Sequence, residues 1–330
     1  MKKIKLLSLL TLLTFSSLVG CGNPNSSSGN EQISSSENSI EVSSEIKDDY
    51  KLTIVSPSGA PAIAIADLAY NYKDQYNFEL NKEATILQQS FLGNELDVII
   101  APINLGATMY NKNGNYQLAS MLTWGNLYFA SRIENFTLES MNDQDVVFFG
   151  QGTINQYVVE SILEYNNIEP KSISYLGSTS LTQGQLISDE NTIALVAEPA
   201  LSVAKNKVQG ITSISVQELY AEMTKKGSYP QAGCFIRKNT IKEHKEVVDN
   251  FIVNLENSAN KTSTNTEEIA GYAQELQFGG TKAVLTNAIP NCNIDFVKAI
   301  DCKTQVETLF ANALNYCGGK LPDEGFYYQK

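Results

Sequence analysis

A glycine turn near the start of the globular part of the chain could bind a small ligand. It consists of Ser58, Gly59 and Ala60, and it joins a β-branched stretch at 51–55 to an Ala-rich stretch at 62–72 that is predicted to be helical. The first N–H groups of a helix have no partner inside the helix, so they favour an anionic or carbonyl-type group. The alternative is a plain strand-to-helix turn that needs glycine for its backbone angles.

A second glycine turn, Gly150-Gln151-Gly152-Thr153, lies in the middle of the sequence. Its glycines would let a ligand approach the backbone, and the Gln151 and Thr153 side chains offer hydrogen bonds. Thr153 also fits a capping box with Gln156 at the start of a predicted helix over 155–165. Capping and ligand contact are both open to Thr153.

Two polar side chains follow runs that are predicted to be buried strands. Asn104 comes after the run at 97–102, and Glu198 ends the run at 192–197. Asn104 can donate and accept hydrogen bonds, whereas Glu198 could receive a ligand N–H or a cation. A Glu198 that faces the site would disfavour a bare anion such as nitrate. The alternatives are a helix cap for Asn104 and a capping or interlobe role for Glu198.

Trp124 is the one tryptophan of the sequence, and it could stack on a planar ligand near a hinge. A core position is the alternative. The single histidine, His244, lies in a charged stretch and is predicted to be solvated. We find no nucleophile elbow, phosphate loop or dinucleotide fingerprint, so we expect no catalytic residues, no cofactor and no metal.

The elements around these residues repeat. In each half of the body a strand, a glycine turn and a helix are followed by a buried strand, a proline and another helix. The pattern predicts two α/β lobes with ligands at the carboxyl ends of their strands. We expect lobe one to comprise 48–127 plus 236–330 and lobe two 128–235. Strand candidates at 127–131 and 234–237 are predicted to join the lobes as hinge strands.

The chain begins with lysines and a short apolar run, which is typical of a secretory signal over residues 1–20. The run ends in Leu18-Val19-Gly20-Cys21, which resembles the bacterial lipobox, in which the cysteine is acylated. An ordinary signal with a chance cysteine is the alternative. Residues 21–47 would then be the acylated Cys21 and a Ser-rich, disordered tether. We therefore expect a lipid anchor on the extracytoplasmic face of the cell membrane.

Composition and cysteine spacing exclude several classes of protein. The formal net charge of −12 argues against nucleic acid as a partner. Cys234, Cys292, Cys302 and Cys317 have no metal-ligand spacing. Free thiols are expected for these four, and a Cys302–Cys317 disulfide is the alternative.

Several stretches together resemble the type-II periplasmic-binding-protein fold, and more narrowly the nitrate/sulfonate/taurine and thiamin-precursor class of ABC-importer solute-binding proteins. These stretches are SPSGAP at 56–61, DVIIAPIN at 97–104, LTWGNLY at 122–128, FGQGT at 149–153, AEPA at 197–200 and GGKLPDEGFY at 318–327. The resemblance implies two Rossmann-like lobes joined by two hinge strands, and a monomer that delivers a small solute to an ABC permease and its ATPase. It does not specify the ligand, because members carry nitrate, sulfonates, bicarbonate or pyrimidines.

Two other functions remain open at this stage. The same fold includes enzymes, such as pyrimidine-precursor synthases and a chorismate-type dehydratase, which work in the cytoplasm. A non-transport adhesin or surface sensor domain is the other possibility. For the transport function, Trp124, Glu198 and the many tyrosines favour a planar aromatic polar solute, with sulfonates and similar small anions second.

Overall fold

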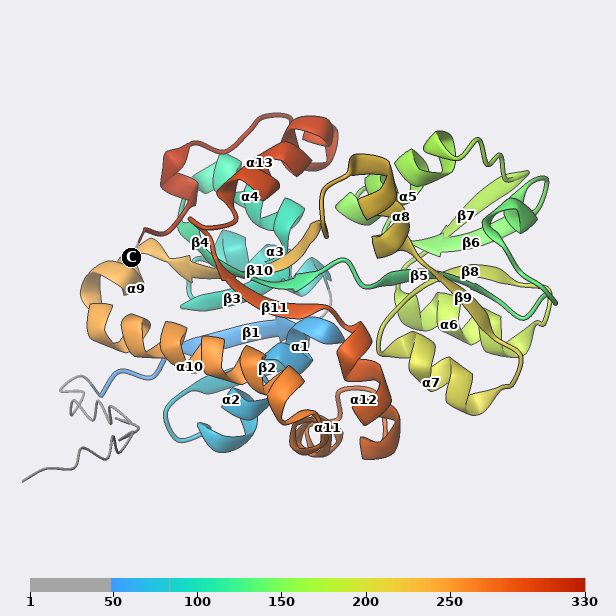
Figure 1. The fold of residues 1–330 in the computed structure, drawn as a ribbon. Coiled ribbons are helices and arrows are strands. Elements are labelled where there is room, and N and C mark those ends of the chain that lie inside the picture. The colour runs from blue at the N-terminus through green and yellow to red at the C-terminus, as the bar shows by residue number, and fades with distance from the viewer. Residues whose placement is uncertain (1–48, 83, 330) are drawn as a thin grey trace, which may run out of the picture. The chain divides into compact units, whose positions relative to one another are not determined.

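A computed structural model describes residues 49–82 and 84–329 of the chain (Figure 1). The predicted signal, the lipid attachment at Cys21 and the tether lie outside these residues. Within the described part, no helix is both long enough and apolar enough to cross a membrane.

The first sheet has six strands in the described residues, in the order β11-β4-β10-β3-β1-β2. Its strands are β1 (Thr53–Pro57), β2 (Asn77–Lys82), β3 (Val98–Pro102), β4 (Tyr116–Trp124), β10 (Pro230–Arg237) and β11 (Ile294–Lys298). β1 runs parallel to β2 and β3, whereas β10 is antiparallel to both β3 and β4. The apolar run predicted at 97–102 forms β3, which is buried along most of its length because its place inside the sheet leaves both faces covered.

The second sheet has five strands in the described residues, in the order β7-β6-β8-β5-β9. Its strands are β5 (Leu127–Ser131), β6 (Asp145–Phe149), β7 (Ser172–Leu176), β8 (Ile193–Ala197) and β9 (Thr212–Ser215). β6 runs parallel to β7 and β8, and β5 is antiparallel to β8 and β9.

The two sheets repeat one plan, as the sequence predicted. The order β2-β1-β3-β10 in the first sheet matches β7-β6-β8-β5 in the second. In each case the strand that follows the parallel ones is antiparallel and is supplied by the chain as it arrives from the other sheet. The carboxyl ends of the parallel strands, where the glycine turns lie, therefore occupy equivalent edges of the two sheets.

Helices cover both sheets (Figure 1). With the first sheet are α1 (Ala60–Ala64), α2 (Ala66–Asn71), α3 (Ala84–Gly93), α4 (Ile103–Asn113), α9 (Lys238–Glu243), α10 (Lys245–Thr264), α11 (Thr266–Glu275), α12 (Lys282–Ala288) and α13 (Lys303–Asn312). With the second sheet are α5 (Ile154–Tyr165), α6 (Thr179–Ser188), α7 (Ala200–Lys207) and α8 (Val216–Thr224). Short 3₁₀ turns are η1 (Leu138–Met141), η2 (Ile289–Asn291), η3 (Leu314–Tyr316) and η4 (Glu324–Phe326).

One helix prediction was wrong in detail. The stretch at 62–72 is not continuous, because Ile65 leaves the α-helical region with φ −107° and ψ 13° and separates α1 from α2. The N–H of Ile65 bonds to the carbonyl of Ala62, three residues back, which is the spacing of a 3₁₀ turn.

The chain crosses between the sheets in two short segments. Gly125 and Asn126 lie between β4 and β5, and residues 225–229 lie between α8 and β10. A Cβ at Gly125 would lie 2.1 Å from the Tyr229 ring, so the two crossings pack too closely for any other residue there. The predicted hinge strands lie within the sheets themselves, and the boundary predicted at 235 falls inside β10, which pairs with β3 and β4.

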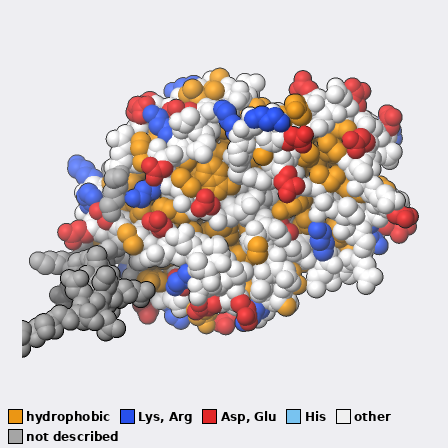
Figure 2. Space-filling view, in the orientation of Figure 1, with side chains coloured by type: hydrophobic (Ala, Val, Ile, Leu, Met, Phe, Trp, Pro, Cys, Tyr) orange, Lys and Arg blue, Asp and Glu red, His pale blue; other side chains and the backbone are white. Residues whose placement is uncertain are grey.

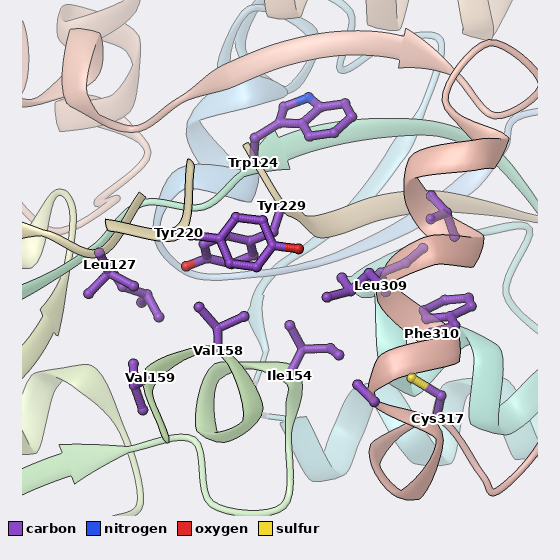
Figure 3. Packing of buried hydrophobic residues seen from close by; sticks show 14 of the residues in the cluster. Trp124, Leu127, Ile154, Val158, Val159, Tyr220, Tyr229, Leu309, Phe310 and Cys317 are labelled. Atoms are coloured by element: carbon purple, nitrogen blue, oxygen red, sulfur yellow. The ribbon is translucent and has the colours of Figure 1, made fainter. Parts of the chain in front are cut away.

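A single hydrophobic cluster runs from one sheet to the other (Figure 3). Around the crossings it contains Trp124, Leu127, Tyr220 and Tyr229. Burial of large side chains at the crossings stabilises their position relative to both sheets.

Two sequence predictions concern the cysteine side chains and the single histidine. Cys234, Cys292, Cys302 and Cys317 are all free and buried, so the predicted free thiols are confirmed and the Cys302–Cys317 pair is not formed. His244 is not simply solvated: its ring stacks on Tyr50 with the centroids 3.7 Å apart. On the face shown in Figure 2, acidic and basic side chains are interspersed over both sides of the view.

Candidate functional site

A cavity of about 880 Å³ lies where the carboxyl ends of the parallel strands from both sheets meet, and we call it the inter-sheet cavity. It is lined by the last residues of five strands, namely Pro57, Pro102, Phe149, Leu176 and Ala197. The first residues of α1, α5, α6 and α7 also line it, as does Asn104, the second residue of α4. This is the position in which α/β sheets bind ligands.

Most of the predicted site residues line this cavity, although they come from distant parts of the sequence. They are Ser58, Gly59, Ala60, Asn104, Gln151, Thr153 and Glu198. Gly152 and Trp124 are not among the lining residues. The repeated strand–turn–helix pattern was therefore the sequence signal that predicted a site shared by the two turns.

The first turn offers backbone to the cavity. Gly59 has φ 88°, and a Cβ placed on it would meet no heavy atom within 4 Å among the described residues. Gly59 is the N-cap of α1 and has no side chain with which to cap the first N–H groups of the helix. Pro61 follows within the first turn. Asn104 lies nearby at the start of α4, buried, with its Nδ2 donating to the Tyr316 carbonyl over 3.3 Å.

The second turn bonds its own helix start with side chains. The Thr153 hydroxyl accepts from the N–H of Asn155 and donates to the Gly150 carbonyl over 2.6 Å. Gln156 accepts from the N–H of Gly152 over 2.7 Å, rather than from Thr153. The predicted capping box is therefore not formed in either half, although Thr153 does cap the helix, and the Gln156 bond turns the Gly152 N–H towards the helix.

Glu198 lies in the cavity wall and also caps a helix. Its two carboxylate oxygens accept from the N–H and the hydroxyl of Ser202, in the first turn of α7, over 3.0 and 2.9 Å. Burial raises the pKa of the Glu198 carboxyl, while the Ser202 hydrogen bonds and the nearby Lys205 oppose that rise. Both roles considered for Glu198 from the sequence are thus compatible with its position.

Trp124 does not lie where a cavity ligand could stack on it. Its indole N–H donates to the Asp295 carbonyl over 3.1 Å, and its ring borders two smaller cavities of about 420 and 270 Å³. Figure 3 shows the indole apart from the Tyr220–Tyr229 pair. Neighbouring residues of a strand point to opposite faces, so Thr123 faces the inter-sheet cavity and Trp124 does not.

Two buried polar residues of the lining, Thr123 and Asn126, were not predicted as site residues from the sequence. Thr123 precedes Trp124, the last residue of β4, and Asn126 lies in the crossing between the sheets. Both are in the LTWGNLY stretch, in which Trp124 was the predicted site residue. Thr123 could have been predicted only from the alternation of side chains along β4 together with the face of the sheet that borders the cavity, and the sequence does not give that face.

The rest of the lining combines apolar residues with uncharged polar side chains and carries little charge. Hydroxyl and amide side chains from the parts of the chain around both sheets line the cavity, including Tyr175, Thr179, Gln183, Gln231 and Gln277. Among the described residues, the charged side chains that line the cavity are Glu198 and the exposed Lys207. No group of three or more metal-binding side chains gathers anywhere in the described part of the chain. The arrangement can hold a small polar molecule by hydrogen bonds from two sides.

Comparison with known proteins identifies the fold. No family model and no curated protein matches the sequence. An ABC transporter structure from Parabacteroides distasonis has a TM-score of 0.72 and 20% identity, with 85% of this chain and 99% of that chain covered. The ligand-binding component of an ABC-type import system from Staphylococcus aureus has a TM-score of 0.67 and 14% identity, over 84% and 96% of the two chains.

A third solved structure is the periplasmic aliphatic sulphonate-binding protein SsuA from Escherichia coli. It has a TM-score of 0.64 and 11% identity, with 84% of this chain and 92% of that chain covered. These similarities span nearly the whole described part of the chain. The chain has the two-lobed α/β fold of periplasmic binding proteins, as the sequence predicted.

Proposed function

We propose that this protein is the solute-binding component of an ABC importer. The observation that carries the proposal is the inter-sheet cavity of about 880 Å³, which is lined by turns from both sheets. Its size suits a small molecule, and its few placed polar groups are typical of binding sites. Two solved structures of the same fold, similar along almost their whole length, are an ABC transporter structure and the ligand-binding component of an ABC-type import system.

The proposed mechanism is capture followed by closure. A solute that contacts both sheets' turns stabilises the arrangement in which the turns are close, so binding favours a closed form. The two crossings at 125–126 and 225–229 are the places where the lobes can move relative to one another. The lobes predicted from the sequence are 48–127 plus 236–330 and 128–235. The membership of β10 in the first sheet supports a second boundary before Pro230 instead of after residue 235. The closed form docks on a membrane permease, whose ATPase drives uptake.

We further propose that the protein acts as a monomer held at the extracytoplasmic face of the membrane by lipid on Cys21. The basic, apolar and Leu-x-Gly-Cys segments in sequence support this anchor. Expression of the full chain in a Gram-positive host should give an acylated N-terminal Cys21 peptide. The Cys21→Ser variant should appear in the medium, and equal membrane retention of that variant would contradict the anchor.

The proposed solute is small and polar, with planar N–H-bearing heterocycles first and sulfonates second. Protein purified without its lipid should be studied by native mass spectrometry, to detect solute carried through purification, and by a thermal-shift screen of both groups. The stabilising solute should increase ATP hydrolysis by the reconstituted permease and be recovered chemically unchanged. Binding without any effect on the permease, or repeated conversion of the solute, would contradict the transport function.

A further inference from the structure

One wall of the inter-sheet cavity contains side-chain oxygens that have no partner. Thr123 and Asn126 both line the cavity and are 1% and 4% exposed. The Thr123 Oγ1 and Asn126 Oδ1 atoms are buried and have no hydrogen-bond partner among the described residues. A buried oxygen without a partner loses its bonds to water and gains nothing in return, so such groups are rare and call for an explanation.

The orientation of the Asn126 amide is fixed by its neighbour. Its Nδ2 donates to the Glu198 backbone carbonyl over 3.2 Å, and the Asn126 backbone carbonyl accepts from the Glu198 N–H over 3.1 Å. The nitrogen end therefore already donates one of its two N–H groups, whereas the oxygen end has no partner among the described residues. An amide oxygen can only accept a hydrogen bond.

Glu198 adds a negative charge to the same wall. Its carboxylate accepts hydrogen bonds from Ser202 in the first turn of α7. The N-terminus of α7, which would otherwise attract an anion, is therefore already occupied by a carboxylate. Each carboxylate oxygen has a second lone pair for a further donor. The other charged lining residue, Lys207, is exposed, and Lys205 directs its Nζ to Ser213 instead.

We propose that Thr123, Asn126 and Glu198 form a subsite that accepts hydrogen bonds from an uncharged or cationic solute carrying N–H or O–H groups, and that it disfavours sulfonates and other anions. This inference rests on the proposed function, since it names the class of solute that the cavity takes. Asn126 and Glu198 are acceptors, and Thr123 can accept or donate, so a donor-bearing solute satisfies all three. An anion would face the Glu198 charge and leave the Asn126 side-chain oxygen without a partner. The subsite therefore differs in preference from a sulphonate-binding neighbour that shares its fold.

The first test compares three benzene derivatives that differ only in the head group, together with one heterocycle. Benzamide and benzamidine are the donor-bearing probes, benzenesulfonate is the anionic one, and cytosine represents donor-bearing heterocycles. At least one donor-bearing probe should raise the unfolding temperature of the wild-type protein, and benzenesulfonate should not. Stabilisation by benzenesulfonate, or by none of the donor-bearing probes, overturns the inference.

The second test removes one hydroxyl at a time from strand β4. Thr123→Val should lower the affinity for the best donor-bearing probe by about 5–100-fold, because a buried hydrogen bond to the solute is lost. The empty protein should be no less stable, since the hydroxyl has no partner there. Ser120→Ala is the matched control. Ser120 is also on β4, and its buried hydroxyl has no partner among the described residues, but Ser120 does not line the cavity. Equal affinity losses in both variants would overturn the inference.

The third test removes the charge. Glu198→Gln should weaken benzamidine binding by about tenfold or more, whereas Glu190→Gln, an exposed carboxylate outside the cavity, should not. Unchanged benzamidine affinity in folded Glu198→Gln contradicts the subsite. Anion binding that still stimulates the permease would overturn this inference and leave the proposed function standing. Absence of binding by every solute, with an unstimulated permease, would remove the proposed function itself.

Discussion

The two strand–turn–helix units that border the cavity share a backbone plan but satisfy their helix starts in different ways. In the first, Gly59 begins a helix of 5 residues with φ 88° and no side-chain cap. In the second, Thr153 caps a helix of 12 residues, and Gln156 bonds the Gly152 N–H. The first unit thus presents backbone to a solute, whereas the second presents the side chains of Gln151 and Thr153. Equivalent positions in a repeat need not bind by equivalent groups.

Gly59→Val should have the largest effect, because it alters the unit that presents backbone. The branched side chain would project into the open space beside Gly59, so solute affinity should fall by at least about tenfold, or about 1.4 kcal/mol. The positive φ should also cost about 1–3 kcal/mol of folding free energy. Calorimetry measures the affinity, and denaturant unfolding measures the stability.

Gly210→Val separates these two effects. Gly210 has φ 82° and open space around it, but it does not line the cavity. This variant should lose similar stability and keep its solute affinity. A parallel loss of affinity in both variants would mean that Gly59 acts through folding alone.

Gln151→Ala should have a smaller effect, because it removes one side-chain contact from the unit that presents side chains. Affinity should fall by about 0.5–1.5 kcal/mol, the net contribution of one hydrogen bond. Stability should not change, since Gln151 is exposed in the empty protein. Gln185→Ala, an exposed glutamine of α6 outside the cavity, is the matched control for calorimetry. Unchanged affinity in Gln151→Ala would show that only the first turn binds.

The pH dependence of stability tests the buried carboxyl at the start of α7. Burial raises the pKa of Glu198 in the folded protein above its value in the unfolded chain. A raised carboxyl pKa favours folding when the group is protonated, so this contribution is fully present below about pH 4.3, the unfolded-state value, and is lost as the pH rises through the folded-state pKa.

Wild type should therefore gain stability relative to Glu198→Gln as the pH falls, in urea unfolding between pH 8 and 4. Lys205, Tyr128 and Cys292 are the other titratable groups close to Glu198, and both proteins retain them. Glu190→Gln should show no such trend. A pH-independent difference between wild type and Glu198→Gln would contradict the raised pKa.

Trp124→Phe should have the smallest effect on binding. The Trp124 ring lies outside the inter-sheet cavity, so affinity should stay within about twofold, which is about 0.4 kcal/mol. Loss of the bond to the Asp295 carbonyl should cost about 0.5–1.5 kcal/mol of stability. An affinity loss as large as that of Gln151→Ala would restore the stacking role predicted from the sequence.

The sequence predicted the elements whose patterns are local. β3 and β8 could be recognised because an apolar run without alternation is typical of a strand covered on both faces. The start of α5 could be recognised from Thr153, which caps it. The break at Ile65 could not, since it depends on backbone angles in the middle of an apolar stretch that is otherwise a good helix.

The site was only partly predictable, because its walls depend on tertiary position. The two turns followed from the repeat, but the face of β4 that borders the cavity could not be assigned before the sheets were placed. Trp124 was therefore chosen over Thr123. Gln277 and Phe278 reach the cavity from the loop between α11 and α12, far along the chain, and no local motif marks them.

The most direct test of the central claim is hydrogen–deuterium exchange with and without a stabilising solute. The solute should protect amides in both turns, in peptides covering 57–61 and 149–155, because both line the inter-sheet cavity. Peptides covering 289–308, which border the smaller cavities beside Trp124, should change less. Protection confined to one turn, or concentrated in 289–308, would contradict a solute site shared by the two sheets.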